Sequence, residues 1–128
     1  MEKKRILVVD DEVGFTRMVR LNLEQTGAYE VREVNEGKTA LAAAREFKPD
    51  LILLDVVMPD MDGGDVAAAI QQDPLLKRIP VIFVTAVVRK REAGSAGMVS
   101  GGSLFLAKPI DVVELIDAIE TSLGKPGA

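Results

Sequence analysis

Short runs of apolar residues alternate with stretches of helical periodicity along most of this chain, and this alternation constrains the fold more than any other feature. Five runs have the length and composition of β-strands: Ile6–Val9, Val31–Val34, Leu51–Leu54, Val81–Val84 and Leu104–Leu106. Several are apolar throughout, which is typical of strands covered on both faces. The pattern therefore predicts an α/β protein of the (βα)5 type, a doubly wound five-stranded parallel sheet with helices on both faces.

Apolar residues three or four positions apart mark the helices between these strands. The clearest stripe lies near the C-terminus, where Asp111 is a predicted N-cap and Glu114 follows three residues later. The members of that stripe are Val112, Leu115, Ile116, Ile119 and Leu123. Three weaker stripes predict the other helices: Phe15, Met18, Val19 and Leu23; Ala40, Ala44 and Phe47; Val66, Ala69 and Ile70.

The segment Ala93–Gly102, where a fourth helix is expected, interrupts this rhythm. It reads AGSAGMVSGG and contains four glycines, each of which costs about 1 kcal/mol in a helix interior relative to Ala. We therefore expect the fourth helix to be short, frayed or absent, and the segment to be mobile until a modification of the protein or a partner orders it.

The composition excludes several kinds of chemistry. The 128 residues include no Cys and no His, which rules out thiol nucleophiles, thiolate zinc sites and Ser-His-Asp catalysis. The net charge of −4 gives no basic surface for direct nucleic-acid binding. No apolar run approaches the roughly 18 residues of a membrane span, and the N-terminus lacks the features of a signal peptide. We expect a cytoplasmic protein without membrane insertion.

Polar side chains follow four of the five predicted strands. Asp10 and Asp11 come after the first, Asp55 after the third, Thr85 after the fourth and Lys108 after the fifth. Each has an ordinary explanation by itself, such as a helix cap for the acidic pair or a turn for Asp55. Their coincidence matters more, because reactive groups in such sheets gather beyond the carboxyl ends of the strands.

Three carboxylates in one place raise one another's pKa values unless a cation neutralises them. Mg²⁺ is the simplest such cation, since it takes oxygen ligands and is usually held by one or two carboxylates with phosphate. Asp55 is then a candidate nucleophile that would form an acyl phosphate. Thr85 and Lys108 would supply a hydrogen-bond donor and a positive charge to the added phosphoryl group.

At these residues the chain resembles the receiver domains of two-component response regulators. Four segments carry the resemblance, in the family's order and at its spacing: VVDDE (Val8–Glu12), LLDVVMPDMDG (Leu53–Gly63), VTA (Val84–Ala86) and LAKPI (Leu106–Ile110). The resemblance spans essentially the whole chain. It implies a single CheY-like receiver domain, residues 1–128, with the flavodoxin-like strand order 2-1-3-4-5.

The resemblance also implies a role for each matching residue. Asp55 matches the phosphoacceptor, and Asp11 the direct Mg²⁺ ligand, with Asp10 acting largely through water. Val57 matches the position whose backbone carbonyl completes the metal shell. Asp55, Asp11, Asp10 and Val57 are thus the expected metal set.

Thr85 and Lys108 match the pair that binds the phosphoryl group and assists its transfer. Phe105 matches the aromatic switch residue, which turns inward when Thr85 moves onto the phosphoryl group. The Lys108–Pro109 bond is expected to be cis, as is common in the family. Val57 and Val87 cannot hydrogen-bond an attacking water, so we also expect slow self-dephosphorylation.

The implied function is a phosphorylation-dependent signalling switch, not a turnover enzyme. The donor would be the phospho-histidine of a sensor histidine kinase or a His-containing phosphotransfer protein, because this chain has no His. The output would be a downstream protein target or an output domain. The chain ends at Gly124–Ala128, which leaves open a stand-alone regulator or a segment of a longer protein.

Two alternatives use the same fold. A phosphorylation-independent receiver-like interaction module is favoured only by the glycine-rich segment Ala93–Gly102. A phosphatase with an aspartyl-phosphate intermediate would need a substrate-binding cap, and the sequence shows no such insertion.

Overall fold

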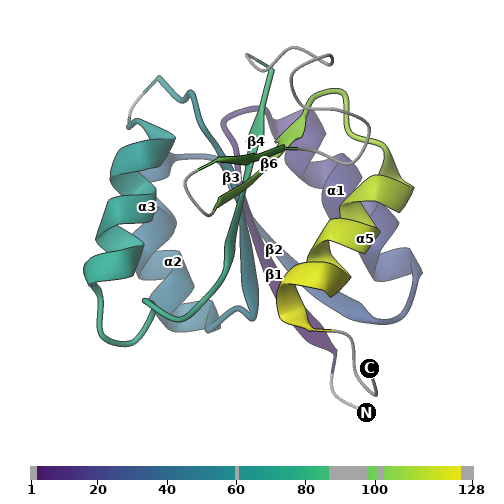
Figure 1. Ribbon diagram of the computed structural model, residues 1–128, viewed down its shortest axis with the longest axis horizontal. Coiled ribbons are helices and arrows are strands. Elements are labelled where there is room, and N and C mark those ends of the chain that lie inside the picture. The colour runs from purple at the N-terminus through teal and green to yellow at the C-terminus, as the bar shows by residue number, and fades with distance from the viewer. Residues whose placement is uncertain (1–2, 60, 87–97, 101–102, 125–128) are drawn as a thin grey trace.

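The computed structural model describes residues 3–59, 61–86, 98–100 and 103–124, and nothing below concerns the structure of the others. A single sheet lies between two layers of helices (Figure 1). Its strands are β1 (Lys4–Val9), β2 (Tyr29–Val34), β3 (Leu51–Asp55), β4 (Val81–Thr85), β5 (Met98–Ser100) and β6 (Ser103–Ala107). The helices are α1 (Val13–Gln25), a 3-10 turn at Gly37–Thr39, α2 (Ala40–Phe47), α3 (Gly63–Gln72) and α5 (Val112–Leu123).

The five predicted strands form the parallel part of the sheet, in the predicted order. β1 pairs with β2 and β3, β3 pairs with β4, and β4 pairs with β6, each in parallel. The strand predicted at Leu104–Leu106 is β6, so the observed order β2-β1-β3-β4-β6 is the expected 2-1-3-4-5. The strand order reverses between β1 and β3, which is where an open α/β sheet places its functional groups.

A sixth strand occupies the described part of Ala93–Gly102, where the fourth helix was expected to be short, frayed or absent; the strand itself was not predicted. Residues Met98–Ser100 form β5, which pairs antiparallel with β6 and opposes Val99 to Leu104. A helix here would keep several glycines in its interior, whereas pairing with β6 satisfies backbone groups at little conformational cost. The rest of the segment lies outside the described residues, as does the expectation that it becomes ordered on phosphorylation.

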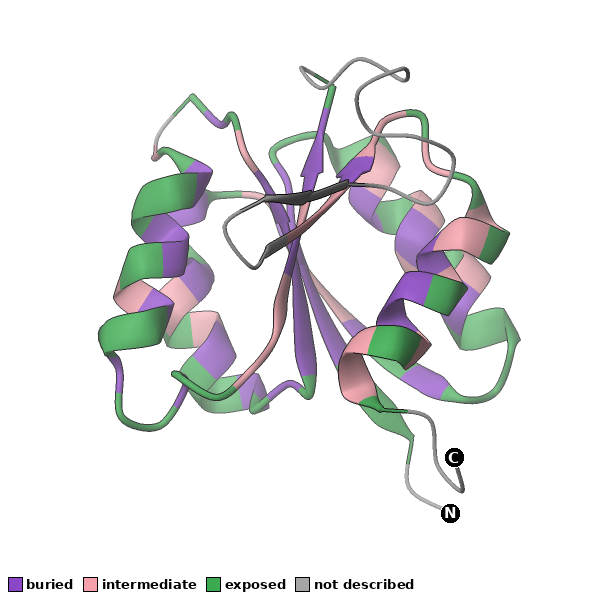
Figure 2. Ribbon diagram, in the orientation of Figure 1, coloured by how far each residue is buried: buried purple, intermediate pink, exposed green. Residues whose placement is uncertain are grey.

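Alternating residues of the central strands supply two separate cores. Ile6 and Val8 of β1 face α1 and α5, while Leu7 and Val9 face α2 and α3. All five residues of β3 are buried. Figure 2 shows β3 buried along its length and β1 exposed only where it begins, while the helices have exposed residues on their outer faces. Of the helices that the structure describes, none is long and apolar enough to cross a membrane.

Two aspartates at helix starts act as N-caps, and one of them, Asp111, was predicted to do so. The Asp111 carboxylate accepts hydrogen bonds from the backbone N–H groups of Val113 and Glu114, at 2.8 and 3.3 Å. Asp62 accepts one from Gly64 N at 2.7 Å and begins α3. These bonds satisfy donors that the first helical turn leaves without partners.

Asp73 ends α3 and holds the chain between α3 and β4. Its carboxylate accepts hydrogen bonds from the backbone N–H of Leu75 at 2.8 Å and from Arg45 Nε at 2.7 Å. The Leu75 N–H and the Arg45 guanidinium keep the pKa of Asp73 below its ordinary value of 3.8. A carboxylate with a lowered pKa stabilises the fold above its unfolded-state pKa and stops doing so as the pH falls through its folded-state pKa.

We therefore expect Asp73→Asn to lower the melting temperature at neutral pH, because the neutral amide loses the ionic bond to Arg45. The difference from the wild type should shrink as the pH is lowered below about 4. Thermal unfolding across this range measures both effects. Glu46→Gln, which removes an exposed partner of Arg32, is the control and should change little. An Asp73→Asn protein as stable as the wild type at neutral pH would contradict this role.

Candidate functional site

Backbone pairing brings the four predicted strand ends to one edge of the sheet, the upper edge in Figure 1. Asp10 directly follows β1, and its N–H donates to the Val34 carbonyl at the end of β2. Asp55 is the last residue of β3 and lies opposite Val84 of β4. Thr85 ends β4, and its carbonyl accepts a hydrogen bond from the Lys108 N–H at 3.0 Å. Each polar group is thus fixed by the strand that precedes it.

Three carboxylates form the centre of this edge. Oxygen atoms of Asp10, Asp11 and Asp55 all lie within 4.8 Å of one another. Asp10 is fully buried and Asp55 is only 5% exposed, whereas Asp11 is exposed to solvent. Two of the three charges are therefore largely removed from water, which is unfavourable without a compensating charge.

Burial has a direct effect on the acidity of this cluster. Burial, together with the neighbouring Asp10 carboxylate, raises the pKa of Asp55 from 3.8 to about 6, against the opposing effect of Lys108. Burial likewise raises the pKa of Asp10, against a hydrogen bond from Lys108. Both shifts show that negative charge at this edge is only partly compensated by the chain's own groups.

The carboxylate set fits a hard divalent cation. Mg²⁺ prefers oxygen ligands and keeps several waters, so one or two carboxylates with access to solvent are sufficient to hold it. Here a buried pair, Asp10 and Asp55, lies beside the exposed Asp11. Val57, whose carbonyl was predicted to complete the shell, follows β3 by two residues, and its side chain is 61% exposed. That side chain contributes little to the core, and the role of the carbonyl stays a prediction.

Lys108 is the cation of the site, and in the described structure it pairs with two carboxylates. Its Nζ lies 2.8 Å from Asp10 Oδ2 and 2.5 Å from Glu12 Oε1, and Asp55 is not among its ion-pair partners in the described structure. Burial alone would lower the pKa of Lys108, but hydrogen bonds to Asp10 and Glu12 outweigh it and raise the pKa. The ammonium therefore stays charged and can bind a further anion.

The remaining predicted residues are located as follows. Phe105 of β6 is partly buried, and its ring stacks on Phe83 of β4 with centroids 4.9 Å apart. The Lys108–Pro109 bond is cis, as predicted. Val87, invoked for slow dephosphorylation, lies outside the described residues.

Three supporting residues were not predicted. Glu12 pairs with Lys108, Phe15 places its ring under the same ammonium, and Asn35 Nδ2 donates to the Asp10 carbonyl at 2.8 Å. The acidic run Asp10-Asp11-Glu12 was the one available signal, and only its first two members were assigned roles. Nothing local to Phe15 or Asn35 indicates a partner that is distant in the sequence.

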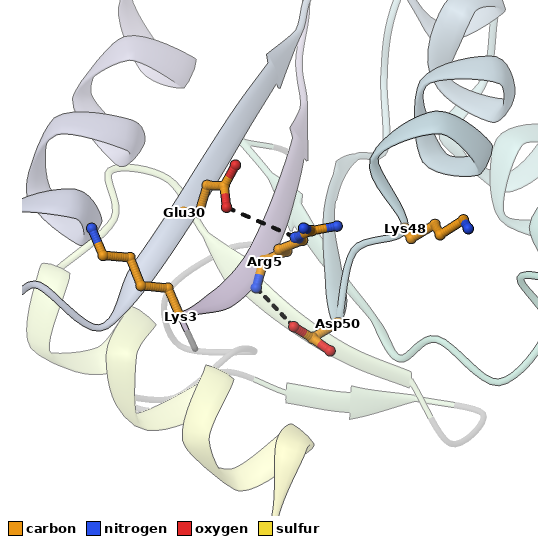
Figure 3. Close-up of a pocket in the computed structure, with 5 residues that line it drawn as sticks. All are labelled: Lys3, Arg5, Glu30, Lys48 and Asp50. Atoms are coloured by element: carbon orange, nitrogen blue, oxygen red, sulfur yellow. Dashed lines mark hydrogen bonds and ion pairs between the residues drawn. The ribbon is translucent and has the colours of Figure 1, made fainter. Parts of the chain in front are cut away.

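A shallow depression of about 400 Å³ lies at the opposite edge of the sheet, where the strands begin (Figure 3). Its lining residues are Lys3, Arg5, Glu30, Lys48 and Asp50. Both carboxylates are engaged by Arg5: its N–H donates to Asp50 at 2.8 Å, and its guanidinium lies 3.8 Å from Glu30. The length of the strands separates the depression from Asp10, Asp11 and Asp55, so the edge where the strands end remains the candidate site.

The chain is similar to known proteins over most of its length. A family model described as the response regulator receiver domain matches residues 6–120. The response regulator PleD of Caulobacter vibrioides is 43% identical over 117 residues, which are 91% of this chain and 25% of PleD. The polar-differentiation response regulator DivK of Brucella anthropi is 35% identical over 121 residues, which are 94% of this chain and 97% of DivK.

A solved structure shows the same fold. The chemotaxis protein CheY4 of Vibrio cholerae superposes with a TM-score of 0.81 at 30% identity, over 95% of this chain and 100% of that one. The chain spans only a quarter of PleD but nearly all of DivK. The similarity therefore concerns one unit that occurs both in longer regulators and with little else attached.

Proposed function

The chain belongs to the response regulator receiver domain family of two-component systems, and from this we propose that it is a phosphorylation-dependent switch with Asp55 as its phosphoacceptor. One observation carries the proposal. Asp55 ends a fully buried central strand, is 5% exposed itself, and lies beside two further aspartates. Thr85 ends the adjacent strand β4, and Lys108 follows β6, the next strand along the sheet. A solvated turn aspartate would have none of this support.

In the proposed reaction an Asp55 carboxylate oxygen forms a bond to phosphorus while the P–N bond of a phospho-histidine breaks. The donor imidazole keeps the electron pair of the broken bond and takes up a proton. Mg²⁺, held by Asp11, Asp55 and the Val57 carbonyl with Asp10 acting through water, would supply positive charge beside the carboxylates and the transferred oxygens. Thr85 would donate a hydrogen bond to the phosphoryl group, and Lys108 would balance its charge.

The donor is then a partner protein, a sensor histidine kinase or a His-containing phosphotransfer protein, because the chain has no His. The modified group is part of the chain, so each phosphorylation changes the protein itself, and the dephosphorylated donor is the other product. The change would pass through Thr85 and Phe105 to a downstream protein target or output domain. We place this function in the cytoplasm, with no direct nucleic-acid contact.

Phosphorylation by a small donor tests the proposal. With acetyl phosphate and Mg²⁺, we expect the protein to gain the mass of one phosphoryl group, and hydroxylamine or removal of Mg²⁺ to abolish the product. Asp55→Asn should lose the modification completely. Asp62→Asn is the matched control, because Asn also serves as an N-cap and the site carboxylates remain. A wild-type protein that stays unmodified under these conditions would favour the phosphorylation-independent interaction module.

A further inference from the structure

The Lys108 ammonium lies in a three-sided site formed mainly by the first turn of α1 and the residues before it. Asp10 Oδ2 is 2.8 Å away, Glu12 Oε1 is 2.5 Å away, and the centroid of the Phe15 ring is 4.6 Å away. The Lys108 side chain is 13% exposed, whereas that of Glu12 is 63% exposed. Two carboxylates and an aromatic face therefore surround one ammonium.

Only one of these three contacts belongs to the aspartate cluster. Asp10 lies beside both Asp55 and the Lys108 ammonium. Glu12 and Phe15 hold the Lys108 ammonium near α1. The proposed reaction needs the same ammonium beside Asp55. The described structure thus shows Lys108 in contact with two groups, Glu12 and Phe15, that lie outside the aspartate cluster.

We propose that Glu12 and Phe15 form a holding site for the Lys108 ammonium in the unphosphorylated protein, and that Glu12 is a positioning residue that slows phosphorylation of Asp55. This inference rests on the proposed function. A phosphoryl group adds a charge of about −2 at neutral pH and three acceptor oxygens, so it outcompetes the single exposed Glu12 carboxylate once formed. Before that, Lys108 must leave Glu12 to assist the transfer.

The expected effect is modest, because the pairing carboxylate is exposed and its interaction with Lys108 is screened by solvent. We expect Glu12→Gln to speed acyl-phosphate formation from acetyl phosphate about two- to fivefold. The gain should fall at high salt, since it comes from an ion pair. Phe15→Leu, which keeps an apolar side chain but removes the aromatic face, should change the rate in the same direction.

Glu36→Gln is the matched control for charge. Glu36 follows β2 at the same edge of the sheet and pairs with Lys38 at 3.6 Å, so the substitution removes one negative charge without touching Lys108. A similar acceleration in Glu36→Gln would show that general electrostatic attraction of the donor is responsible, and it would overturn the holding site.

A second measurement does not depend on phosphorylation. Protons over an aromatic face are shifted upfield, so the ε-methylene protons of Lys108 should have upfield NMR shifts in the wild type that diminish in Glu12→Gln. Unchanged shifts would overturn the proposal, even if the wild type is never phosphorylated. If the Lys108 shifts change in Glu12→Gln but the rate of acyl-phosphate formation does not, then Glu12 does not slow phosphorylation. Acyl phosphate on Asp55 of the wild type would still support the proposed function in that case.

Discussion

Asp55→Asn is expected to raise the free energy of unfolding by about 1–3 kcal/mol at neutral pH in the absence of divalent cations. The reason is the cost of keeping this carboxylate ionised. Burial and the Asp10 carboxylate raise the pKa of Asp55 from 3.8 to about 6. Above that pH the folded protein holds an unfavourable charge that the neutral amide does not carry.

The pH dependence follows from the sign of this shift. Because the folded-state pKa lies above the unfolded-state value, the folded protein binds the Asp55 proton more tightly. The wild type therefore loses this part of its stability as the pH rises from about 4 through about 6. The difference in the free energy of unfolding between Asp55→Asn and the wild type should grow over the same pH range and level off above it.

Urea unfolding in EDTA at several pH values measures this difference, with Asp62→Asn as a control that leaves the cluster unchanged. Addition of Mg²⁺ should then stabilise the wild type, since a ligand that binds only the folded state raises its stability. Asp55→Asn should gain less. Equal stability of Asp55→Asn and wild type at neutral pH without Mg²⁺ would contradict the raised pKa.

Gly63→Ala is expected to destabilise the protein by about 3 kcal/mol. Gly63 is buried at the start of α3, and its N–H donates to the Val56 carbonyl at 2.9 Å. A Cβ at this position would lie 2.2 Å from the Asp55 carbonyl oxygen and 2.8 Å from Val56 Cα. These are backbone atoms, so no side-chain rotation can relieve the overlap.

The added methyl group must therefore displace either the first turn of α3 or the end of β3. Displacing β3 would also move Asp55, so acyl-phosphate formation should fall along with stability. Gly64→Ala is the matched control: its Cβ would meet only Asp62 Oδ1, at 3.2 Å, and Ala favours the helix. We expect it to be neutral or slightly stabilising. Chemical denaturation of both variants tests this, and equal effects would refute the close packing.

The parts of this structure that were predictable are those encoded by local pattern. Runs such as Leu51–Leu54 are apolar throughout because β3 is buried on both faces, and the polar residue after each run belongs to the site because all parallel strands end at one edge. Strand β5 was not predictable in this way. Met98–Ser100 has no alternating pattern of its own, and its strand conformation depends on pairing with β6.

Within the site, too, some features follow from local sequence pattern and others depend on contacts between distant parts of the chain. Asp10, Asp55, Thr85 and Lys108 are each marked by the strand that precedes them. The contact between Glu12 and Lys108 joins residues 96 positions apart, so only the folded chain shows it. The roles of Val57 and Phe105 stay predictions, because they concern a metal shell and a phosphorylated state.

The strand order has a consequence for synthesis of the chain. Asp10, Asp11 and Asp55 all precede β4, whereas Lys108 follows β6, the last of the parallel strands to be made. A nascent chain that paired only β1 with β3 would bring the carboxylates together before their ammonium partner had emerged. Repulsion within that partial sheet opposes its persistence. The acidic edge thereby links stable folding of the first half of the protein to the arrival of its last strand.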